Sequence, residues 1–235
     1  MSYILQELSL IIPTKNDHYR IKDNLKDILD YLESKIKNFE VLIVSNKSSN
    51  QSIEYLEALA SYNAFIKHIS IKEGGKGVAI RKGIEKSKFT NILFTDADCS
   101  VKINEFDKFT INGNLKSPFV IGNRKNKLSE NLNSPLLRKL SGYFYLNINK
   151  KLFNLGIEDT QCGFKAIDKQ KFKNCDNFKT SGFSFDIELI LLALKSGINI
   201  IEIPVKYVHN SNSKVNVFFQ TIRMLYEILL IKKRF

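Results

Sequence analysis

The first hundred residues alternate between short apolar runs and amphipathic stretches, and this alternation restricts the fold more than any other feature. Apolar runs at residues 8–14, 41–45, 64–71 and 91–98 predict strands. Stretches at 19–36, 53–62 and 75–87 place apolar residues at helical spacing between them. Strands that alternate with helices form right-handed βαβ units, so we expect an α/β fold built on a mostly parallel, Rossmann-like sheet.

The second half of the chain is less regular. Residues 118–124 predict a strand, residues 136–155 a long aromatic-rich helix, and residues 183–197 a helix that ends at Gly197. A strand over residues 198–209 is interrupted by Pro204, and residues 215–235 predict an amphipathic helix. Because no repeat, low-complexity stretch or linker divides the chain, we expect one domain over residues 1–235.

The charge balance points to an anionic partner. The chain has 36 basic and 24 acidic residues, a net charge of +12. Such an excess suits nucleic acid, a phosphate-rich ligand or an acidic membrane surface, although solvated surface lysines would produce it too. The three cysteines have no metal-ligand spacing, and neither a signal peptide nor a membrane-spanning run is found, so we expect a reduced, cytoplasmic protein.

Two aspartates at the end of the 91–98 strand are the sharpest chemical signal. "LFTDADCS" places Asp96 and Asp98 two residues apart, and so on one face of an extended chain. Carboxylates at the mouth of an α/β sheet suit Mg²⁺ or Mn²⁺ that also holds phosphate oxygens. The alternative is that Asp96 caps a turn and Asp98 is solvated.

The glycine-rich stretch "KEGGKGVAIRKG" at residues 72–83 is not a P-loop. It lacks the Gly-x-x-x-x-Gly-Lys-Ser/Thr spacing, so the chemistry of that motif is not expected. Gly74 and Gly75 instead predict a flexible entry to a helix whose N-terminus faces an anion. Lys76 and Arg81 add positive charge there, or are solvated.

Several segments together identify a family. "IIPTKND", "GKGVAIRKGI", "FTDADCS", "IGNR", "DTQCGFKAI", "GFSFDIELILLA" and "EIPVKYVH" occur in this order. They resemble family 2 glycosyltransferases of the GT-A fold, most closely the polyprenyl-phosphate (dolichyl-phosphate) glucosyltransferases and mannosyltransferases. The resemblance covers about residues 8–214, and "DTQCGFK" is closer to the glucosyltransferases.

This resemblance implies a nucleotide-sugar site in the first half of the chain, about residues 1–115. Asp98 would hold Mg²⁺ or Mn²⁺, and Asp96 would contact the ribose or sugar or share the metal. Asp17 stands where the family usually has Glu. The residues expected against the nucleotide sugar are Pro13, Thr14, Asn16, Asp17, Ser45, Asn46, Lys76, Asp96 and Gln161.

The loop after the 41–45 strand departs from the family, which commonly has Asp-Asp-Gly-Ser-x-Asp there. Ser45, Asn46 and Asn50 replace the acids, and Lys47 replaces the glycine. Neutral amides and hydroxyls still donate to and accept from a base edge, so we expect nucleotide binding with altered selectivity.

The resemblance also implies an acceptor-side half at about residues 116–214. Arg124 and Arg138 would face phosphates of donor or acceptor. Lys214 would hold a diphosphate or the acceptor phosphate, in a loop where Asn212 replaces the family's glycine. Asp159 has two interpretations: a general base for a hydroxyl acceptor, or a structural partner of Lys165 or Arg138.

Other residues of this half have weaker functional interpretations. Cys162 is expected to be a buried filler rather than a nucleophile. Asp186 and Glu188 would help to shape the acceptor side, unless Asp186 makes a buried structural hydrogen bond.

The C-terminal helix can lie on a membrane or close the core. Phe218, Phe219, Leu225, Ile228 and Leu229 would enter lipid in the first case, with cations at anionic headgroups. We favour peripheral contact with the cytoplasmic membrane face.

The resulting hypothesis is a metal-dependent inverting transferase that moves a hexose, glucose from UDP-glucose, to polyprenyl phosphate. The alternatives are transfer to a glycan hydroxyl, nucleotidyl transfer, and a non-catalytic homologue that binds nucleotide or membrane. Nucleic acid is not expected as a partner, and no sequence feature sets the oligomeric state.

Overall fold

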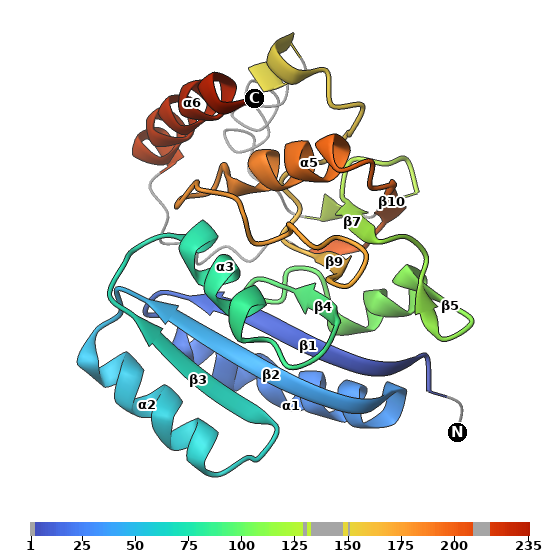
Figure 1. The fold of residues 1–235 in the computed structure, drawn as a ribbon. Helices are drawn as coiled ribbons and strands as arrows, with labels where there is room; N and C mark the ends of the chain where they lie inside the picture. The colour runs from blue at the N-terminus through green and yellow to red at the C-terminus, as the bar shows by residue number, and fades with distance from the viewer. Residues whose placement is uncertain (1–2, 129–130, 133–147, 150, 209–216) are drawn as a thin grey trace.

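A mixed α/β sheet organises the chain (Figure 1). The structure, a computed structural model, describes residues 3–128, 131–132, 148–149, 151–208 and 217–235. Its main sheet has seven strands in the order β10-β7-β9-β4-β1-β2-β3. They are β1 (Leu5–Thr14), β2 (Ile36–Asn46), β3 (Ile66–Ile71), β4 (Asn91–Phe94), β7 (Phe119–Asn123), β9 (Lys165–Asp168) and β10 (Ile200–Pro204).

The remaining elements lie around this sheet. The helices are α1 (His18–Lys35), α2 (Asn50–Ser61), α3 (Lys76–Lys86), α5 (Phe185–Lys195) and α6 (Val217–Arg234), with a 3-10 helix η1 (Ile103–Phe109). Two short pairs complete the list: β5 (Thr110–Ile111) with β6 (Asn114–Leu115), and β8 (Asn131–Leu132) with β11 (Tyr207–Val208). Helices α1 and α2 contact each other on one face of the sheet, and α3 and α5 contact each other on the other (Figure 1).

The parallel arrangement of β1, β2, β3 and β4 is as expected from the alternation. β1 pairs with β2 over its whole length, and Thr14 at its end lies opposite Ser45. The carboxyl-terminal parts of β1 and β2 are buried without interruption, from Leu8 and from Phe39 onward, because helices cover both faces of the sheet there. The register brings the carboxyl ends of neighbouring strands level, which is where ligands bind in open α/β sheets.

The strand β9 is the main departure from the expected pattern. It lies antiparallel between β4 and β7, and the sequence did not predict it. It is short, and it carries Lys165, whose side chain is fully buried. Its sequence therefore lacks the apolar run by which the other strands were predicted.

Two expected elements differ in length. β4 ends at Phe94, so the predicted strand over 91–98 is too long, and Asp96 and Asp98 lie in the loop beyond it. The 198–209 strand is divided into β10 and β11 around Pro204, as expected. Most of the predicted helix over 136–155 lies outside the described residues; of its end, residues 148–149 and 151–153 are helical.

The C-terminal helix α6 has two apolar faces. Met224, Ile228 and Ile231 are buried against the body, so placing Ile228 in lipid is wrong. The other face leaves apolar residues in solvent at i, i+3, i+7 and i+10, which is one side of a helix. This exposed stripe consists of Phe219, Ile222, Tyr226 and Leu229.

Phe218 and Leu225 were also expected to enter lipid. The side chain of Phe218 lies outside the described residues, and Leu225 is half-buried. Among the described residues, no helix has the length and apolar character needed to cross a membrane.

Candidate active site

The carboxyl ends of β1 and β2 are joined by the side chain of Asn46. Its amide Nδ2 donates to the carbonyl oxygen of Thr14 at 2.8 Å, and its Oδ1 accepts from the N–H of Gly75 at 2.9 Å. Only 5% of Asn46 is exposed. The side chain therefore ties β1 and the loop before α3 to β2, and the expectation that it reads a nucleotide base is not supported.

Ser45 likewise faces the protein and not a ligand. Its side chain is fully buried, and its hydroxyl lies 2.8 Å from Nε2 of His68 on β3. Burial lowers the pKa of His68, which keeps this contact neutral. The predicted contact between Ser45 and a base is wrong for this geometry, because the hydroxyl has no exposed surface.

The loop after β1 is fastened to the loop after β2. Asn16 accepts from the N–H of Ser49 at 2.7 Å through its Oδ1, and its own N–H donates to the hydroxyl of Ser48 at 3.3 Å. Pro13 and Thr14 are buried, and Thr14 Oγ1 has no hydrogen-bond partner among the described residues. The loop thus presents Asn16 and Asp17, both half-buried, at the edge of the sheet.

Three non-glycine residues adopt left-handed backbone conformations at this edge. Asn16, Lys47 and Cys99 have φ of 59°, 46° and 45°, and they follow β1, β2 and β4, which are neighbouring strands. Such conformations are uncommon outside glycine and persist only where the surroundings enforce them. Their clustering marks this edge as the constrained part of the fold.

Each aspartate of "DAD" lies beside a cation. Asp96 Oδ1 lies 2.5 Å from Nζ of Lys76, and Asp98 Oδ2 lies 3.9 Å from Nη1 of Arg20. Asp98 Oδ1 also accepts from the N–H of Ser100 at 3.1 Å, which bends the chain away from the strand. The side chains of Asp96 and Asp98 are 44% and 21% exposed, so both remain open to a ligand.

The field around Asp96 keeps it ionised. Burial alone would raise the pKa of Asp96, but the charge and hydrogen bond of Lys76 outweigh it, so the pKa lies below its ordinary value. The same contact raises the pKa of Lys76 against the effect of burial. Gly163 packs against this carboxylate, since a Cβ there would lie 2.0 Å from Asp96 Oδ2.

The aspartate pair fits the way that Mg²⁺ is held beside a phosphate substrate. Among the described residues, no group of three or more His, Cys, Asp and Glu side chains could hold a metal ion by itself. Mg²⁺ is, however, usually bound by one or two carboxylates, with waters and substrate phosphates as its other ligands. Two partly exposed carboxylates in the loop after β4 suit that arrangement.

Asp159 holds Arg124 at the end of β7. Its Oδ2 accepts from the backbone N–H and from Nε of Arg124 at 2.9 and 2.8 Å, and its Oδ1 accepts from Nη2 at 2.9 Å. Asp159 is fully buried, and Glu202 accepts from its N–H at 2.9 Å. The observed partner is therefore Arg124: Lys165, one of the two expected partners, pairs with Asp186 instead, and the other, Arg138, lies outside the described residues.

This pairing argues against Asp159 as a general base. Burial would raise its pKa, but the charge and hydrogen bonds of Arg124 hold the pKa well below its usual range. A base needs a pKa near the operating pH and a free oxygen within reach of the acceptor. Of the two interpretations, the geometry supports the structural one, in which Asp159 orients the partly exposed Arg124.

The match to a family model settles which family this is. The model described as glycosyl transferase family 2 matches residues 9–175. That range contains most of β1, all of β2, β4 and β7, and the aspartate pair. The chain belongs to glycosyl transferase family 2.

Curated relatives of this family member are dolichyl-phosphate beta-glucosyltransferases. The protein of that name from Dictyostelium discoideum is 28% identical over 245 residues, covering 97% of this chain and 74% of the relative. The one from Homo sapiens is also 28% identical, covering 98% of this chain and 76% of the relative.

Solved structures share the fold. Glucosyl-3-phosphoglycerate synthase from Mycobacterium tuberculosis, in complex with Mn²⁺, UDP-glucose and phosphoglyceric acid, has a TM-score of 0.69 at 13% identity. The alignment covers 97% of this chain and 80% of that one. Mannosyl-3-phosphoglycerate synthase from Rubrobacter xylanophilus has a TM-score of 0.68 at 14% identity, with 98% and 76% covered.

The first turn of α3 is not an open anion site in this glycosyltransferase. The N–H groups of Gly77 and Val78 both donate to the carbonyl oxygen of Ser181, at 2.9 and 3.3 Å. The expectation that this helix N-terminus faces an anion is wrong, because the protein's own loop fills it. Arg81 donates to the carbonyl of Phe178 at 2.8 Å, which leaves Lys76 as the cation of this segment that faces Asp96.

Two further carboxylates are used inside the protein. Asp186 accepts from Nζ of Lys165 at 2.5 Å with both side chains buried, and burial raises the pKa of Asp186. Glu188 accepts from the N–H and hydroxyl of Thr180 at 2.7 and 2.6 Å. The acceptor-side role suggested for both is therefore replaced by a structural one.

Cys162 is confirmed as a buried filler. Its side chain is fully buried, and burial raises the pKa of its thiol to about 11. It packs against Gly122 at the end of β7, where an added Cβ would lie 3.0 Å from its Sγ.

The other expected site residues lie nearby or outside the described residues. Gln161 is half-buried in the loop that holds Asp159, and Arg138 and Lys214 fall outside the described part of the chain. Arg20 was missed. The signal that could have identified it is its position three residues after Asp17, the residue that precedes α1, because this spacing places two side chains on one side of a helix.

Proposed function

We propose that this glycosyltransferase moves glucose from UDP-glucose to the phosphate of a polyprenyl or dolichyl phosphate, with inversion and with Mg²⁺ or Mn²⁺ bound. The observation that carries the proposal is the aspartate pair at the carboxyl edge, flanked by Lys76 and Arg20. The names of the curated relatives support the sugar and the acceptor, and the ligands of the solved neighbours support the nucleotide and the metal.

The donor site is proposed to lie within residues 1–115. Asp98, with Asp96, would hold a divalent cation, which supplies positive charge to the diphosphate as it leaves. Lys76 and Arg20 would add fixed positive charge beside the same oxygens, where it stabilises the negative charge that develops on the leaving group. Asn16, Asp17 and Gln161 are proposed to contact the nucleotide sugar from the loops around the edge.

The acceptor site is proposed to lie in residues 116–214, with Arg124 directed at a phosphate by Asp159. In the reaction, an oxygen of the acceptor phosphate forms a bond to the anomeric carbon while the bond from that carbon to the diphosphate oxygen breaks. UDP leaves with the electron pair. Arg138 and Lys214 remain candidates for further phosphate contacts.

The state of Asp159 favours a phosphate acceptor over a hydroxyl. A hydroxyl nucleophile needs a base to take its proton, and Asp159, the base candidate, is fully buried and bound to Arg124. A phosphate monoester has a second pKa near 6 and is already an anion at pH 7. It therefore attacks without a protein base.

Contact with an anionic membrane surface is proposed for α6. Its exposed stripe of Phe219, Ile222, Tyr226 and Leu229 is followed by the exposed Lys232 and Lys233 in the last turn. An apolar face beside cations is the pattern of helices that lie in a membrane interface. This orientation would bring the enzyme to a lipid-linked acceptor at the cytoplasmic face.

The experiment that tests the donor proposal is a binding screen of UDP-glucose, GDP-mannose and CDP-glucose with and without Mn²⁺. We expect UDP-glucose to bind, Mn²⁺ to strengthen it, and Asp98→Asn to remove the effect of Mn²⁺. Glu33→Gln, an exposed change on α1, serves as the matched control. A preference for GDP-mannose, or binding that ignores Mn²⁺ in the unmodified enzyme, would contradict the proposal.

A further inference from the structure

The loop of residues 179–184 connects the donor edge to the C-terminal helix. On one side, its Ser181 carbonyl accepts from the N–H groups of Gly77 and Val78, and its Gly182 carbonyl accepts from Gly77 at 3.2 Å. These donors form the first turn of α3, and the helix has no side-chain cap. Because the loop supplies the acceptors that a capping side chain normally provides, the position of this turn follows the loop.

The same turn carries Lys76. Its Nζ contacts Asp96 at 2.5 Å and lies 5.8 Å from the centre of the Phe183 ring, which belongs to the loop. Gly77 allows the close approach, since a Cβ there would lie 2.3 Å from the carbonyl oxygen of Thr180. A shift of the loop must therefore move the lysine that pairs with the donor-site aspartate.

On its other side, the loop is held by Glu227 of α6. Glu227 is 7% exposed, and its Oε2 accepts from the N–H of Ser184 at 3.1 Å. The hydroxyl of Ser184 in turn donates to the carbonyl of Met224 at 3.1 Å. Gly182 lies directly against the carboxylate, because a Cβ there would be 2.1 Å from Glu227 Oε1.

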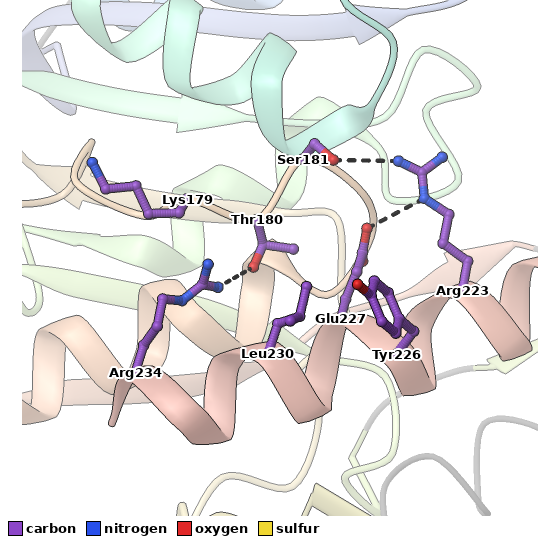
Figure 2. A pocket seen from close by; sticks show the side chains of 8 residues that line it. All are labelled: Lys179, Thr180, Ser181, Arg223, Tyr226, Glu227, Leu230 and Arg234. Carbon is purple, nitrogen blue, oxygen red and sulfur yellow. Dashed lines mark hydrogen bonds and ion pairs between the residues drawn. The ribbon is translucent and has the colours of Figure 1, made fainter.

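The contacts between the loop and α6 border a hollow. Between α6 and residues 179–181 lies a hollow of about 210 Å³, lined in part by Tyr226 and Leu230 (Figure 2). Polar contacts to the loop stand at its two ends: Arg223 to the hydroxyl of Ser181 at 3.3 Å, and Arg234 to that of Thr180 at 2.9 Å. Thr180, at the start of the loop, is also held by Glu188 of α5, so the contacts of Glu227 act on the other end of the loop, at Gly182 and Ser184.

We propose that Glu227 is a positioning residue for the donor site. It fixes the 179–184 loop, the loop fixes the first turn of α3, and that turn fixes Lys76 against Asp96. Glu227 thereby couples the C-terminal helix to nucleotide-sugar binding. The inference rests on the proposed function in one respect, which is that Lys76 acts on the donor.

The test uses the full-length chain and three variants. Glu227→Ala removes the acceptor for Ser184, Glu227→Gln keeps an oxygen at that place, and Glu33→Ala makes the same chemical change at an exposed position of α1. Calorimetry measures the Kd for UDP with Mn²⁺. Hydrogen exchange measures the protection of the Gly77 and Val78 amides, which a purely local role of Glu227 in α6 would leave unchanged.

We expect Glu227→Ala to raise the Kd about five- to tenfold, within the usual range for coupling between sites. It should also speed exchange at Gly77 and Val78 while the amides of β1 and β2 keep their protection. Glu227→Gln should restore most of both properties, and Glu33→Ala should change neither.

The outcomes separate this inference from the proposed function. Failure of the unmodified protein to bind UDP, GDP or CDP with Mn²⁺ would overturn the donor proposal, whereas faster exchange at Gly77 in Glu227→Ala would still support the mechanical link. Unchanged Kd and unchanged Gly77 exchange in that variant would overturn the positioning role. Exchange raised equally throughout the sheet would also overturn it, because Glu227 would then act only on global stability.

Discussion

The pair formed by Arg124 and Asp159 supports a prediction that separates a positioning role from general-base catalysis. Asp159→Asn keeps the size of the side chain and removes its charge, so Arg124 loses the carboxylate that accepts three of its hydrogen bonds. Breaking a buried ion pair from one side costs about 3–5 kcal/mol. Because the Arg124 side chain is 24% exposed and can be partly solvated, we expect the low end, about 3 kcal/mol.

For a chain of this size, about 3 kcal/mol corresponds to a decrease in Tm of roughly 6–12 °C. Arg124→Gln should cost a similar amount, and the double variant should be little worse than either single one, since both remove the same interaction. Thermal unfolding of the unmodified protein, the two single variants and the double variant measures this double-mutant cycle. If Asp159 were a general base without a structural role, the opposite would hold. Asp159→Asn would then lose turnover with an unchanged Tm, and the effects of the two single variants on activity would add.

The pH dependence of stability follows from the same pair. The folded pKa of Asp159 lies below its unfolded value of about 3.9, so its contribution is fully present above that pH and is lost as the pH falls further. We therefore expect the Tm difference between the unmodified protein and Asp159→Asn to be constant from pH 5 to 8 and to shrink below about pH 4. A Tm difference that changes between pH 6 and 8 would refute the assignment of Asp159 as an ionised partner of Arg124.

Three shorter predictions concern the donor edge and α6. Gly163→Ala should weaken Mn²⁺-dependent nucleotide binding at least tenfold, because the new Cβ would displace Asp96, and titration with UDP and Mn²⁺ measures it. Lys76→Met should raise the Kd for UDP by roughly tenfold or more, since the proposed charge contact to the diphosphate is lost, with little change in Tm because the Asp96 side chain is 44% exposed and stays solvated. Ile222→Asp and Tyr226→Asp should each reduce sedimentation with anionic vesicles severalfold without lowering the Tm, because both side chains are exposed, and equal sedimentation would remove the membrane proposal.

The order of strands and helices could be predicted because it depends on local periodicity. The apolar runs and helical spacing placed β1, α1 and α3 within three residues of their bounds, whereas β2 begins at Ile36, five residues before its predicted start. β4 was predicted too long, since Thr95 still pairs with Ile11 but Asp98 then folds back on the N–H of Ser100. The N–H of Cys99 also donates to the carbonyl oxygen of Asp96, so the chain turns after Thr95, and periodicity carries no sign of such contacts.

The partners of the charged residues could not be predicted in the same way. Asp159 and Arg124 are 35 positions apart, and several other cations were equally plausible partners. Lys165 is fully buried, although lysine is ordinarily exposed, so its strand β9 gave no apolar signal. The loop after β2 shows the same limit: Asn46 stands where the family has an acid, and only the fold reveals that its amide ties three segments together.

The most direct test of the account compares two acceptors that differ only in their reacting group. The enzyme is incubated with UDP-glucose labelled in the glucose, Mn²⁺, and either polyprenyl phosphate or the matching polyprenol, and the lipid product is identified by mass. We expect transfer to the phosphate and none to the alcohol, because Arg124 is proposed to bind the acceptor phosphate and Asp159, buried and bound to Arg124, is not placed to act as a base. Glucosylation of the alcohol, or of neither lipid while a free glycan is glucosylated, would contradict it.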